Sequence, residues 1–462
     1  MYFSKRRLSV NLGIALLIMY SSISQVEAEK ILTLEESIEL AKQSNLSSQS
    51  VQERVKAAEA IVRTARAGML PNVAITSSYT YTPNLAKSVI QTGGFGPPGA
   101  ENFLPSPSVE ENDDASDVFE LEFGAHQNFR GEAALRQPVF AWGRYYYNYQ
   151  SAKFNLFGVR KELEAAHNQL ALDVSEAFYG VLLAVEFVKV SQQTVDLVEK
   201  QLQIARNLFD SGAATKFDVL RAEVQLANAK SQLIRTQNTA RTAKNAYKNI
   251  LNINLTDNVN VKGDFNAPEV ELDLETLILA AKTNRPEIHQ FGFTEQANQK
   301  RVAVAKTGSR PDISFFANYQ VDDNERLREM NRIWNLGFSL NLPIFDGFAT
   351  KAAVQESEAA LRQTRLGKHQ LIDAIEFEVR SAYLNLVEAK ALIEVQKNTV
   401  EQARESLRIA NLRYENGIIT SVEFTDAQLA LTQAEVNRLQ SMYDYVVGLK
   451  KLEKATGQKL DG

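Results

Sequence analysis

The sequence predicts a mainly α-helical, exported protein with a few transmembrane β-strands, built from two copies of one plan. Three observations predict it: an internal repeat, segments of about ten residues that alternate between apolar and polar side chains, and long helical stretches almost free of proline. The chain has 462 residues, no cysteine and a formal net charge of −5. The charge excludes a basic-patch nucleic-acid binder. The missing cysteine excludes a thiolate metal site, a cysteine nucleophile and an acylated N-terminal cysteine.

Residues 1–28 have the layout of a secretory signal peptide. A basic cluster at residues 5–7 precedes an uncharged apolar stretch from Leu8 to Ser21, and residues 26–28 resemble a cleavage site. The alternative is a short membrane anchor, but the stretch is shorter than the roughly 20 residues that a spanning helix needs. No later segment is long and apolar enough for such a helix. We therefore expect an exported chain that meets a membrane only through strands or a surface helix.

The remainder of the chain contains an internal duplication. The run Leu32-Thr33-Leu34-Glu35 matches Leu272-Asp273-Leu274-Glu275, an offset of 272 − 32 = 240 residues. The run Pro138-Val139-Phe140 matches Pro343-Ile344-Phe345, an offset of 343 − 138 = 205 residues, which then holds as far as Leu226 and Leu431. A single register kept over such a length indicates a true repeat. The first structural repeat is expected over residues 29–262 and the second over residues 263–462.

Each copy is expected to run through a helix, two strands, a long helix, a turn and a final helix. Glycines mark the turns, at Gly212 and Gly417. The first copy carries an inserted outer loop of 240 − 205 = 35 residues at about 84–118. The expected strands are 71–82 and 119–137 in the first copy, and 312–321 and 333–342 in the second. The expected helices before the strands are 32–68 and 272–308, and the long helices are 145–210 and 348–414.

The strand segments alternate strictly between apolar and polar residues. In the last one, Trp334, Leu336, Phe338 and Leu340 are separated by Asn335, Gly337 and Ser339. A soluble hairpin with one buried face alternates in the same way, but the aromatic apolar faces and charged polar faces favour an outer-membrane barrel. One chain offers four strands, and a bilayer tolerates no open sheet edge. A conducting pore therefore needs at least three chains with cyclic symmetry and about twelve strands.

The duplicated plan, the proline-ended strands and the two turn segments together resemble the TolC family of outer-membrane efflux factors. The turn segments are Ala205-Arg-Asn-Leu-Phe-Asp-Ser-Gly212 and Ala410-Asn-Leu-Arg-Tyr-Glu-Asn-Gly417. The resemblance covers residues 30–457. It implies a homotrimer with a 12-stranded β-barrel in the outer-membrane lipid and a long periplasmic α-helical barrel. It also implies two partners, a periplasmic adaptor (membrane fusion protein) and an inner-membrane transporter, in a tripartite efflux pump or a type I secretion system.

The same resemblance assigns roles to four residues at the turns. Glu423 and Asp426 match an acidic ring at the periplasmic entrance, and six such carboxylates in a trimer favour cations and attract multivalent blockers. Asp218 and Tyr414 match residues whose hydrogen bonding holds that entrance closed.

Two positions at the turns depart from the family pattern. Ile419 stands where the best-known member has an arginine, and Phe217 replaces a threonine. These departures leave open which residues close the gate, with Lys216 and Arg413 as candidate replacements for the family's inter-subunit ion pair.

No catalytic, cofactor or metal site is expected. The four histidines, His126, His167, His289 and His369, have no metal-ligand spacing. The run Gly94-Phe-Gly-Pro-Pro-Gly99 fits GxGxxG formally, but its prolines and its lack of a strand–turn–helix context indicate a loop. We expect a passive exit duct rather than an enzyme. The alternatives are a periplasmic adaptor, which would show one coiled-coil hairpin instead of two, or another exported coiled-coil interaction protein.

Overall fold

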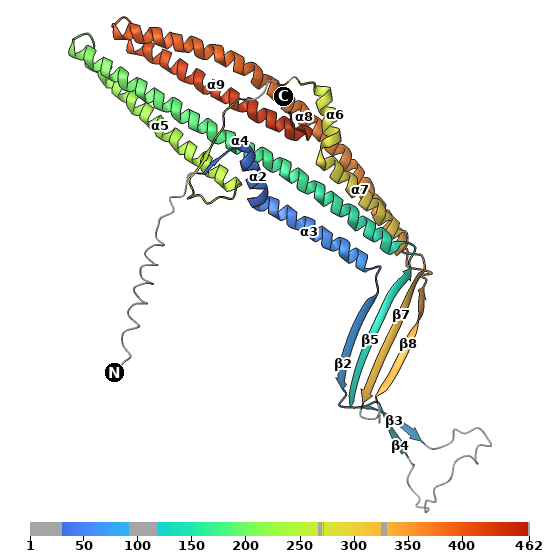
Figure 1. Cartoon of the computed structure of the whole chain (residues 1–462). Coiled ribbons are helices and arrows are strands. Elements are labelled where there is room, and N and C mark those ends of the chain that lie inside the picture. The colour runs from blue at the N-terminus through green and yellow to red at the C-terminus, as the bar shows by residue number, and fades with distance from the viewer. Residues whose placement is uncertain (1–29, 92–117, 267–269, 271, 325–329, 461–462) are drawn as a thin grey trace, which may run out of the picture. The chain divides into compact units, whose positions relative to one another are not determined.

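A computed structural model describes residues 30–91, 118–266, 270, 272–324 and 330–460 (Figure 1). The expected signal peptide and most of the expected inserted loop lie outside the described residues. The helices are α2 (Leu34–Ser44), α3 (Leu46–Ala67), α4 (Arg144–Asp210), α5 (Lys216–Ile250), α6 (Leu274–Asn284), α7 (Pro286–Ala305), α8 (Ala349–Glu415) and α9 (Ser421–Thr456). The strands are β1 (Lys30–Leu32), β2 (Asn72–Tyr81), β3 (Ala86–Gln91), β4 (Val118–Phe123), β5 (Gln127–Phe140), β6 (Val259–Val261), β7 (Asp312–Asn324) and β8 (Asn331–Asn341).

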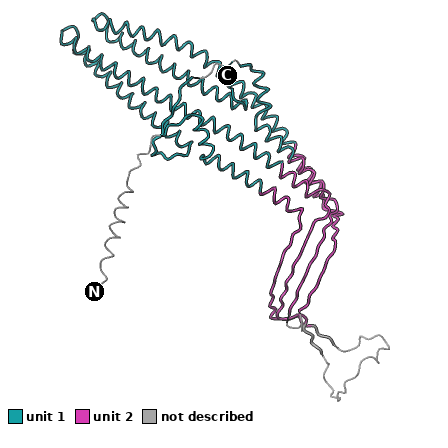
Figure 2. The backbone as a smooth tube through the Cα atoms, in the orientation of Figure 1, with its two compact units in different colours: residues 1–59, 154–296, 362–462 teal, residues 60–153, 297–361 magenta. Residues whose placement is uncertain are grey.

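The chain divides into two compact units, which Figure 2 colours separately. The helical unit comprises residues up to 59, residues 154–296 and residues from 362 onward. The sheet unit comprises residues 60–153 and 297–361.

The sheet unit contains a four-stranded antiparallel sheet in the order β2-β5-β7-β8. Directly paired residues share a face, and one such row joins Ile75, Ala133, Tyr319 and Trp334 across all four strands. The alternating apolar residues therefore form one continuous face. That face is exposed within the chain, with Trp334 at 72% of its full accessibility. The outer strands β2 and β8 each leave one edge without a partner strand among the described residues.

The strand expected over residues 119–137 is two strands in the structure. Gly124 interrupts it with a φ of 107°, a backbone conformation that glycine adopts without steric cost. The segment before the break, β4, pairs with β3 and not with β2. β3 and β4 thus form a separate antiparallel pair. The sequence predicted a loop over the residues of β3 and one continuous strand that included nearly all of β4.

The helices expected over residues 32–68 and 272–308 are each broken once in the structure. Asn45 and Arg285 are extended at the breaks, with ψ near 128° and 120°. The carboxamide oxygen of Asn45 accepts hydrogen bonds from the Ser47 and Ser48 N–H groups, which starts a new helix. Pro286 disfavours a helical conformation for Arg285. Local capping chemistry therefore splits both helices at equivalent positions.

Two apolar clusters hold the helical unit together, one for each copy of the repeat. The first gathers α2, α4 and α5 around Phe178 and Tyr247, whose hydroxyl lies 2.5 Å from the Ser37 hydroxyl. The second gathers α6, α8 and α9 around Val379 and Leu452. A two-stranded parallel pair, β1 with β6, borders the first cluster. Its strands have three residues each, too short to leave an alternating pattern that sequence reasoning could read.

Within the described part of the chain, none of the helices combines the length and the apolar character that crossing a membrane requires.

Candidate functional site

The two long helices end in the same turn. At the first, the Gly212 N–H donates to the Phe209 carbonyl and the Ala213 N–H donates to the Leu208 carbonyl, at 2.9 and 2.8 Å. At the second, Gly417 and Ile418 make the equivalent bonds at 3.0 and 2.9 Å. This pair of bonds is a Schellman motif, which requires a left-handed residue at the glycine. Gly212 and Gly417 have φ values of 75° and 67°.

Both predicted acidic positions begin the following helices as members of capping boxes. The Asp218 carboxylate accepts the Thr215 N–H at 2.9 Å and the Thr215 hydroxyl at 2.7 Å, while the Asp218 N–H donates to that hydroxyl. Glu423 and Thr420 repeat the arrangement at 2.8 and 3.0 Å. These bonds stabilise the ionised carboxylates, so the pKa of each lies below its ordinary value. The Thr-x-x-Asp and Thr-x-x-Glu signals were readable in the sequence, but the sequence analysis did not use them.

Tyr414 lies at the centre of an apolar cluster beneath the second turn. Its ring stacks on Phe424 with centroids 5.3 Å apart, and the side chain is only 5% exposed. Leu197 and Ile204 of α4 pack against the same cluster. The cluster therefore joins the two helical hairpins, α4 with α5 and α8 with α9. Ile419, the departure from the family pattern, also packs here. An isoleucine at this position therefore strengthens an apolar contact where an arginine would carry a charge.

Asp218 acts on Tyr414 only through its charge, and no direct hydrogen bond between them is present among the described residues. The pKa of the Tyr414 hydroxyl is raised, mainly by burial and also by the negative charge of Asp218. Among the described contacts, the Asp218 carboxylate bonds only within its own helix end. Asp426, in the first turns of α9, is exposed and makes no hydrogen bond or ion pair within the described residues.

A polar seam, absent from the sequence prediction, runs between the hairpins above this cluster. The Gln225 amide donates to the Thr425 hydroxyl at 2.8 Å, and the Thr194 and Thr432 hydroxyls lie 3.5 Å apart. Gln201 is fully buried on the same helix as Thr194, and both of its amide atoms lack a partner within the described structure. Leaving a buried amide without a partner costs free energy.

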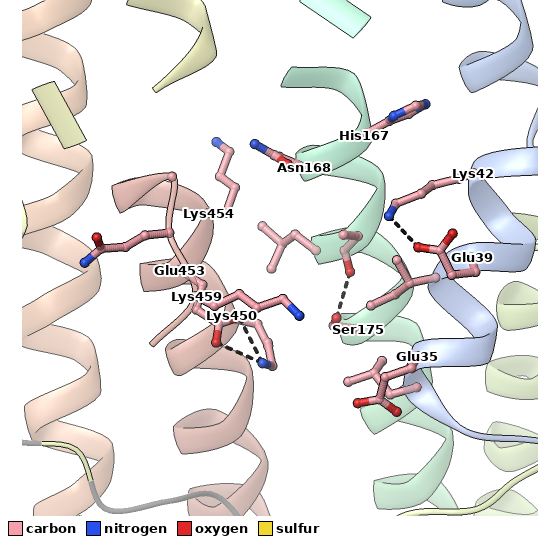
Figure 3. Close-up of a pocket in the computed structure, with 16 residues that line it drawn as sticks. Glu35, Glu39, Lys42, His167, Asn168, Ser175, Lys450, Glu453, Lys454 and Lys459 are labelled. Atoms are coloured by element: carbon pink, nitrogen blue, oxygen red, sulfur yellow. Dashed lines mark hydrogen bonds and ion pairs between the residues drawn. The ribbon is translucent and has the colours of Figure 1, made fainter. Parts of the chain in front are cut away.

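A cavity of about 340 Å³ lies farther along the helical unit, among α2, α4 and the end of α9 (Figure 3). Leu34, Ile38 and Leu172 supply apolar lining. At its rim Lys42 pairs with Glu39 and Lys450 pairs with Glu453. His167 borders it with a pKa lowered chiefly by burial. These two ion pairs neutralise part of the charge at the rim.

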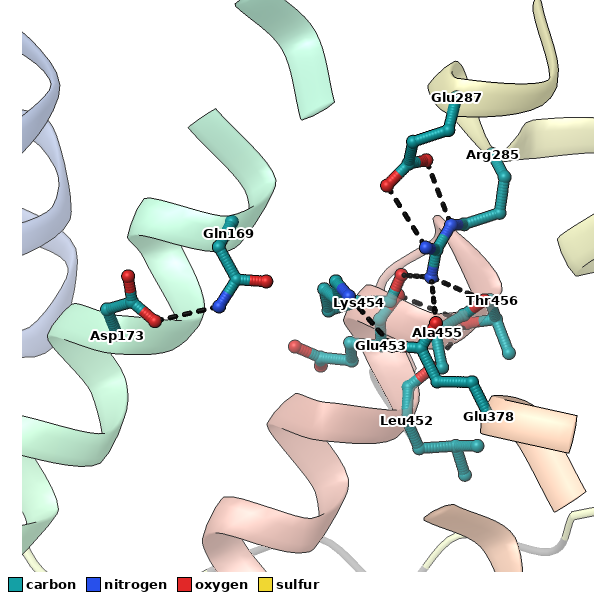
Figure 4. Close-up of polar contacts among 10 residues, drawn as sticks. All are labelled: Gln169, Asp173, Arg285, Glu287, Glu378, Leu452, Glu453, Lys454, Ala455 and Thr456. Atoms are coloured by element: carbon teal, nitrogen blue, oxygen red, sulfur yellow. Dashed lines mark hydrogen bonds and ion pairs between the residues drawn. The ribbon is translucent and has the colours of Figure 1, made fainter. Parts of the chain in front are cut away.

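The break between α6 and α7 carries a buried ionic cluster (Figure 4). Arg285 is 4% exposed and donates to the carbonyls of Lys454 and Ala455 at 3.1 and 3.2 Å. It also forms a bidentate pair with Glu287 at 2.9 and 3.0 Å and an ion pair with Glu378 at 3.1 Å. The arginine thereby holds the end of α9 against α6 and α8. All of its partners are structural, so we assign the cluster no ligand.

In the described ranges, no three histidine, aspartate or glutamate side chains come close enough together to hold a metal ion. His126 binds the Thr82 carbonyl, His167 the Ser48 hydroxyl and His289 the Thr283 carbonyl. Three of the four histidines are thus hydrogen-bonded to groups of the protein, each in a different part of the chain.

Comparison with known proteins gives one consistent result. The family model described as "Outer membrane efflux protein" matches residues 37–252 and 277–458. The chain is 22% identical over 326 residues to the "Outer membrane efflux protein BepC" of Brucella suis, covering 70% of this chain and 71% of that protein. It is 19% identical over 344 residues to the "Alkaline protease secretion protein AprF" of Pseudomonas aeruginosa, covering 72% and 70%.

A solved structure extends the likeness to the fold. The Campylobacter jejuni CmeC outer membrane channel aligns with a TM-score of 0.75 at 17% identity, covering 93% of this chain and 86% of that one. The matched family segments include both turns, with their capping boxes and glycines, and all four strands of the main sheet in full.

Proposed function

This chain belongs to the outer membrane efflux protein family, and on that premise we propose how its turns and its sheet serve transport. The protein is an outer-membrane channel that conducts substrates passively to the exterior, as the exit duct of a tripartite efflux pump or a type I secretion system. Its relatives are channel and secretion proteins, and we propose no enzymatic activity for it.

The observation that carries the proposal is the four-stranded sheet with an exposed apolar face and two unpaired edges. Such a sheet cannot stand alone in a bilayer, because each unpaired backbone group would lack a partner there. Three copies pair β8 of one with β2 of the next and close a 12-stranded barrel in the outer-membrane lipid. The apolar row of Ile75, Ala133, Tyr319 and Trp334 then faces lipid, and the row of Glu132 and Gln320 faces the lumen.

The helical parts of the three copies form the periplasmic portion of the duct, with the two turns of each chain at its entrance. There the channel meets a periplasmic adaptor and an inner-membrane transporter. Glu423 and Asp426 from three chains form an acidic ring. Because Glu423 already accepts two bonds from Thr420, Asp426 is the more available carboxylate for a passing cation.

Closure of the entrance depends on the Tyr414 cluster. This cluster and the polar seam are where the second hairpin rests on the first. The negative charge of Asp218 acts on the Tyr414 hydroxyl from the neighbouring hairpin. We infer that adaptor binding favours a second arrangement of these helices, in which Tyr414 leaves its place beside Asp218.

Single-channel conductance in planar bilayers tests the acidic ring. Asp426→Asn should reduce cation selectivity and block by divalent cations more than Glu423→Gln does. Asp257→Asn, an acidic residue far from both turns, is the control. Unchanged selectivity and block in the Glu423→Gln, Asp426→Asn double variant would show that the ring assignment is wrong.

The test of the gate residues needs a control variant that separates the charge of Asp218 from its role in helix capping. Asp218→Ala removes both the charge beside Tyr414 and the capping bonds, whereas Thr215→Ala removes only the two bonds of the threonine hydroxyl and keeps the charge and the backbone N–H bond of residue 215. If the gate depends on the charge, Asp218→Ala and Tyr414→Phe raise conductance and Thr215→Ala does not. Equal effects of Asp218→Ala and Thr215→Ala would instead mean that the variants merely loosen the turn.

Fractionation and mass measurement separate this proposal from the periplasmic adaptor. The channel should appear in the outer-membrane fraction as a complex of three chains. Recovery only in the soluble periplasm would favour the adaptor or another exported coiled-coil protein.

A further inference from the structure

The sheet unit contains two equivalent turns with an unusual backbone. They follow the ends of β5 and β8 and lead into α4 and α8. In the first, Trp142 and Gly143 are both left-handed, with φ values of 51° and 81°. In the second, Gly347 and Phe348 are both left-handed, with φ values of 64° and 67°. The repeat offset of 205 residues pairs Trp142 with Gly347 and Gly143 with Phe348.

Each turn places an aromatic residue where glycine would be unstrained. Left-handed backbone is unfavourable for bulky side chains and persists only when the surroundings fix it, often at functional positions. Trp142 is fixed by an edge-to-face contact with Phe140 at 5.2 Å, and Phe348 by one with Phe345 at 5.6 Å. The ring comes from the first left-handed residue in one copy and from the second in the other, yet both copies present one.

The aromatic side chains of these left-handed residues do not fill a hydrophobic core. Trp142 is 42% exposed and Phe348 is 68% exposed. Beside them, Ile344 is 94% exposed, and Val139 and Phe345 are also exposed. This surface continues the exposed apolar face of β8, whose last residues are adjacent to the second turn. An apolar surface of this kind requires an apolar neighbour outside the chain.

Cationic side chains border the same surface. The Arg310 guanidinium lies over the Trp142 ring, 5.0 Å from its centroid. Among the described residues, no carboxylate lies within ion-pair distance of Arg310 or Arg144, and the Arg144 side chain contacts the Tyr145 ring and hydroxyl. The nearby Asp346 carboxylate instead accepts the Thr350 N–H at 2.8 Å. The surface therefore pairs exposed rings with an available positive charge.

We propose that the first turn is an anchoring site for a phospholipid headgroup, with Trp142 at the depth of the glycerol backbone and Arg310 bound to the phosphate, and that Phe348 of the second turn lies at the same depth. The inference rests on the proposed barrel, since the turns then lie at the end of the strands nearest the periplasmic helices. Aromatic residues with amphipathic surroundings favour the interface between hydrocarbon and water, and arginine matches the phosphate geometry. A phospholipid is the ligand that offers an anion beside an apolar body.

Quenching of tryptophan fluorescence by brominated lipid tests this depth, because the chain has only two tryptophans, Trp142 and Trp334. Trp334→Phe leaves Trp142 alone. A reference protein carries Phe338→Trp, in the middle of β8, together with Trp142→Phe and Trp334→Phe. Leu336→Trp is a second reference should the first fail to assemble. Each protein is reconstituted in phosphatidylcholine vesicles brominated either near the glycerol end or near the methyl end of the acyl chains.

The expected result is that Trp142 is quenched about twofold more by bromine near the glycerol, and the reference tryptophan by bromine near the chain ends. A reference tryptophan quenched by neither lipid would overturn the barrel itself. A quenched reference with Trp142 quenched by neither lipid, as when a neighbouring copy covers it, would overturn the anchor alone. Quenching that places Trp142 and the reference tryptophan at equal depth would also overturn the anchor.

The phosphate contact has a separate measurement. Lipid phosphorus bound to the purified protein should fall by about one phospholipid per chain in Arg310→Gln. Arg235→Gln, an exposed arginine of α5 in the helical unit, should leave it unchanged. The same lipid content in both variants would contradict the role of Arg310.

Discussion

In both copies of the repeat, the break in the first helix contacts the end of the last helix, but the two copies make this contact, called the joint below, with different side-chain chemistry. In the first copy, the Asn45 amide donates to the Ile250 carbonyl at 2.9 Å, and the Asn252 amide donates back to the Ser44 carbonyl at 3.1 Å. In the second copy, Arg285 occupies the position of Asn45, 240 residues on, and binds the end of α9 with its charge. The backbone is alike in both, since Asn252 and Gly457 are equivalent and both left-handed.

The difference shows that a shared backbone does not fix how its open groups are paired. A neutral amide brings no charge that needs a partner, whereas a buried guanidinium needs carboxylates to compensate its charge. Glu287 and Glu378 provide them. At the first-copy position of Glu378 stands Asp173, which accepts a hydrogen bond from Gln169 (Figure 4). The second joint is therefore one interdependent ionic cluster, and the first consists of separate neutral bonds.

The largest test of this contrast is truncation of the arginine. Arg285→Met removes the charge but keeps most of the apolar length. It takes the bidentate partner from Glu287 and one donor from each of the two carbonyls, while Glu378 keeps its ion pair with Lys454. We expect a local loss of about 3 kcal/mol in the free energy of opening. Asn45→Ala, the equivalent change, should cost about 1 kcal/mol. Amide hydrogen exchange of α6 and the end of α9, compared with α2 and the end of α5, measures both. Similar losses at the two joints would contradict the contrast.

The two turns differ in packing although their backbones agree. Phe209 is the first-copy equivalent of Tyr414, yet it is 41% exposed and has no stacked partner among the described residues. We expect Tyr414→Ala to lower the local free energy of opening by about 3 kcal/mol, because it empties a packed site. Phe209→Ala should cost less than about 1 kcal/mol. Exchange rates in the last turns of α8 and α4 provide the measurement, and a larger effect at Phe209 would reverse the assignment.

The sequence predicted the parts of the fold whose signals are periodic or repeated. The long helices were expected at 145–210 and 348–414 and are found at Arg144–Asp210 and Ala349–Glu415. The family and the outer-membrane channel function followed from the same pattern and are confirmed by the family match. The roles of Glu423, Asp426, Asp218 and Tyr414 at the gate stay predictions.

What the sequence could not show depends on contacts between distant segments or on single residues. The helix break at Asn45 interrupts a helical composition that is otherwise continuous, and only its capping partners reveal it. Pro286 was a readable signal for the break at Arg285. The burial of Ile419 and Gln201 follows from how the second hairpin packs on the first. The burial of these two residues could not be predicted from the spacing of apolar residues, because that spacing describes one helix at a time.

The glycines at the turns should respond alike, which tests the symmetric part of the comparison. Gly212→Ala and Gly417→Ala each place a side chain on a left-handed residue with open space around it. We expect both to destabilise their turn by about 1 kcal/mol, measured by exchange of the amides that flank each turn. A loss confined to one turn would mean that tertiary packing, not the Schellman motif, sets its conformation.

The smallest expected effect is the dependence of the turns on pH. The capping bonds hold the pKa values of Asp218 and Glu423 below their ordinary values of 3.8 and 4.5. A carboxylate with a depressed folded pKa stabilises the folded state above its unfolded pKa and loses that contribution as the pH falls through the folded pKa. Both turns should therefore keep full protection above about pH 5 and loosen progressively at lower pH. Thr215→Ala and Thr420→Ala should each destabilise their helix start by about 1 kcal/mol at neutral pH. They should also reduce the acid loss in part, because the hydroxyl bonds that help to depress the two pKa values are gone while the backbone N–H bonds to the carboxylates remain. A turn that loosens in acid as steeply in the threonine variant as in the unmodified chain would locate the responsible carboxylate outside the capping box.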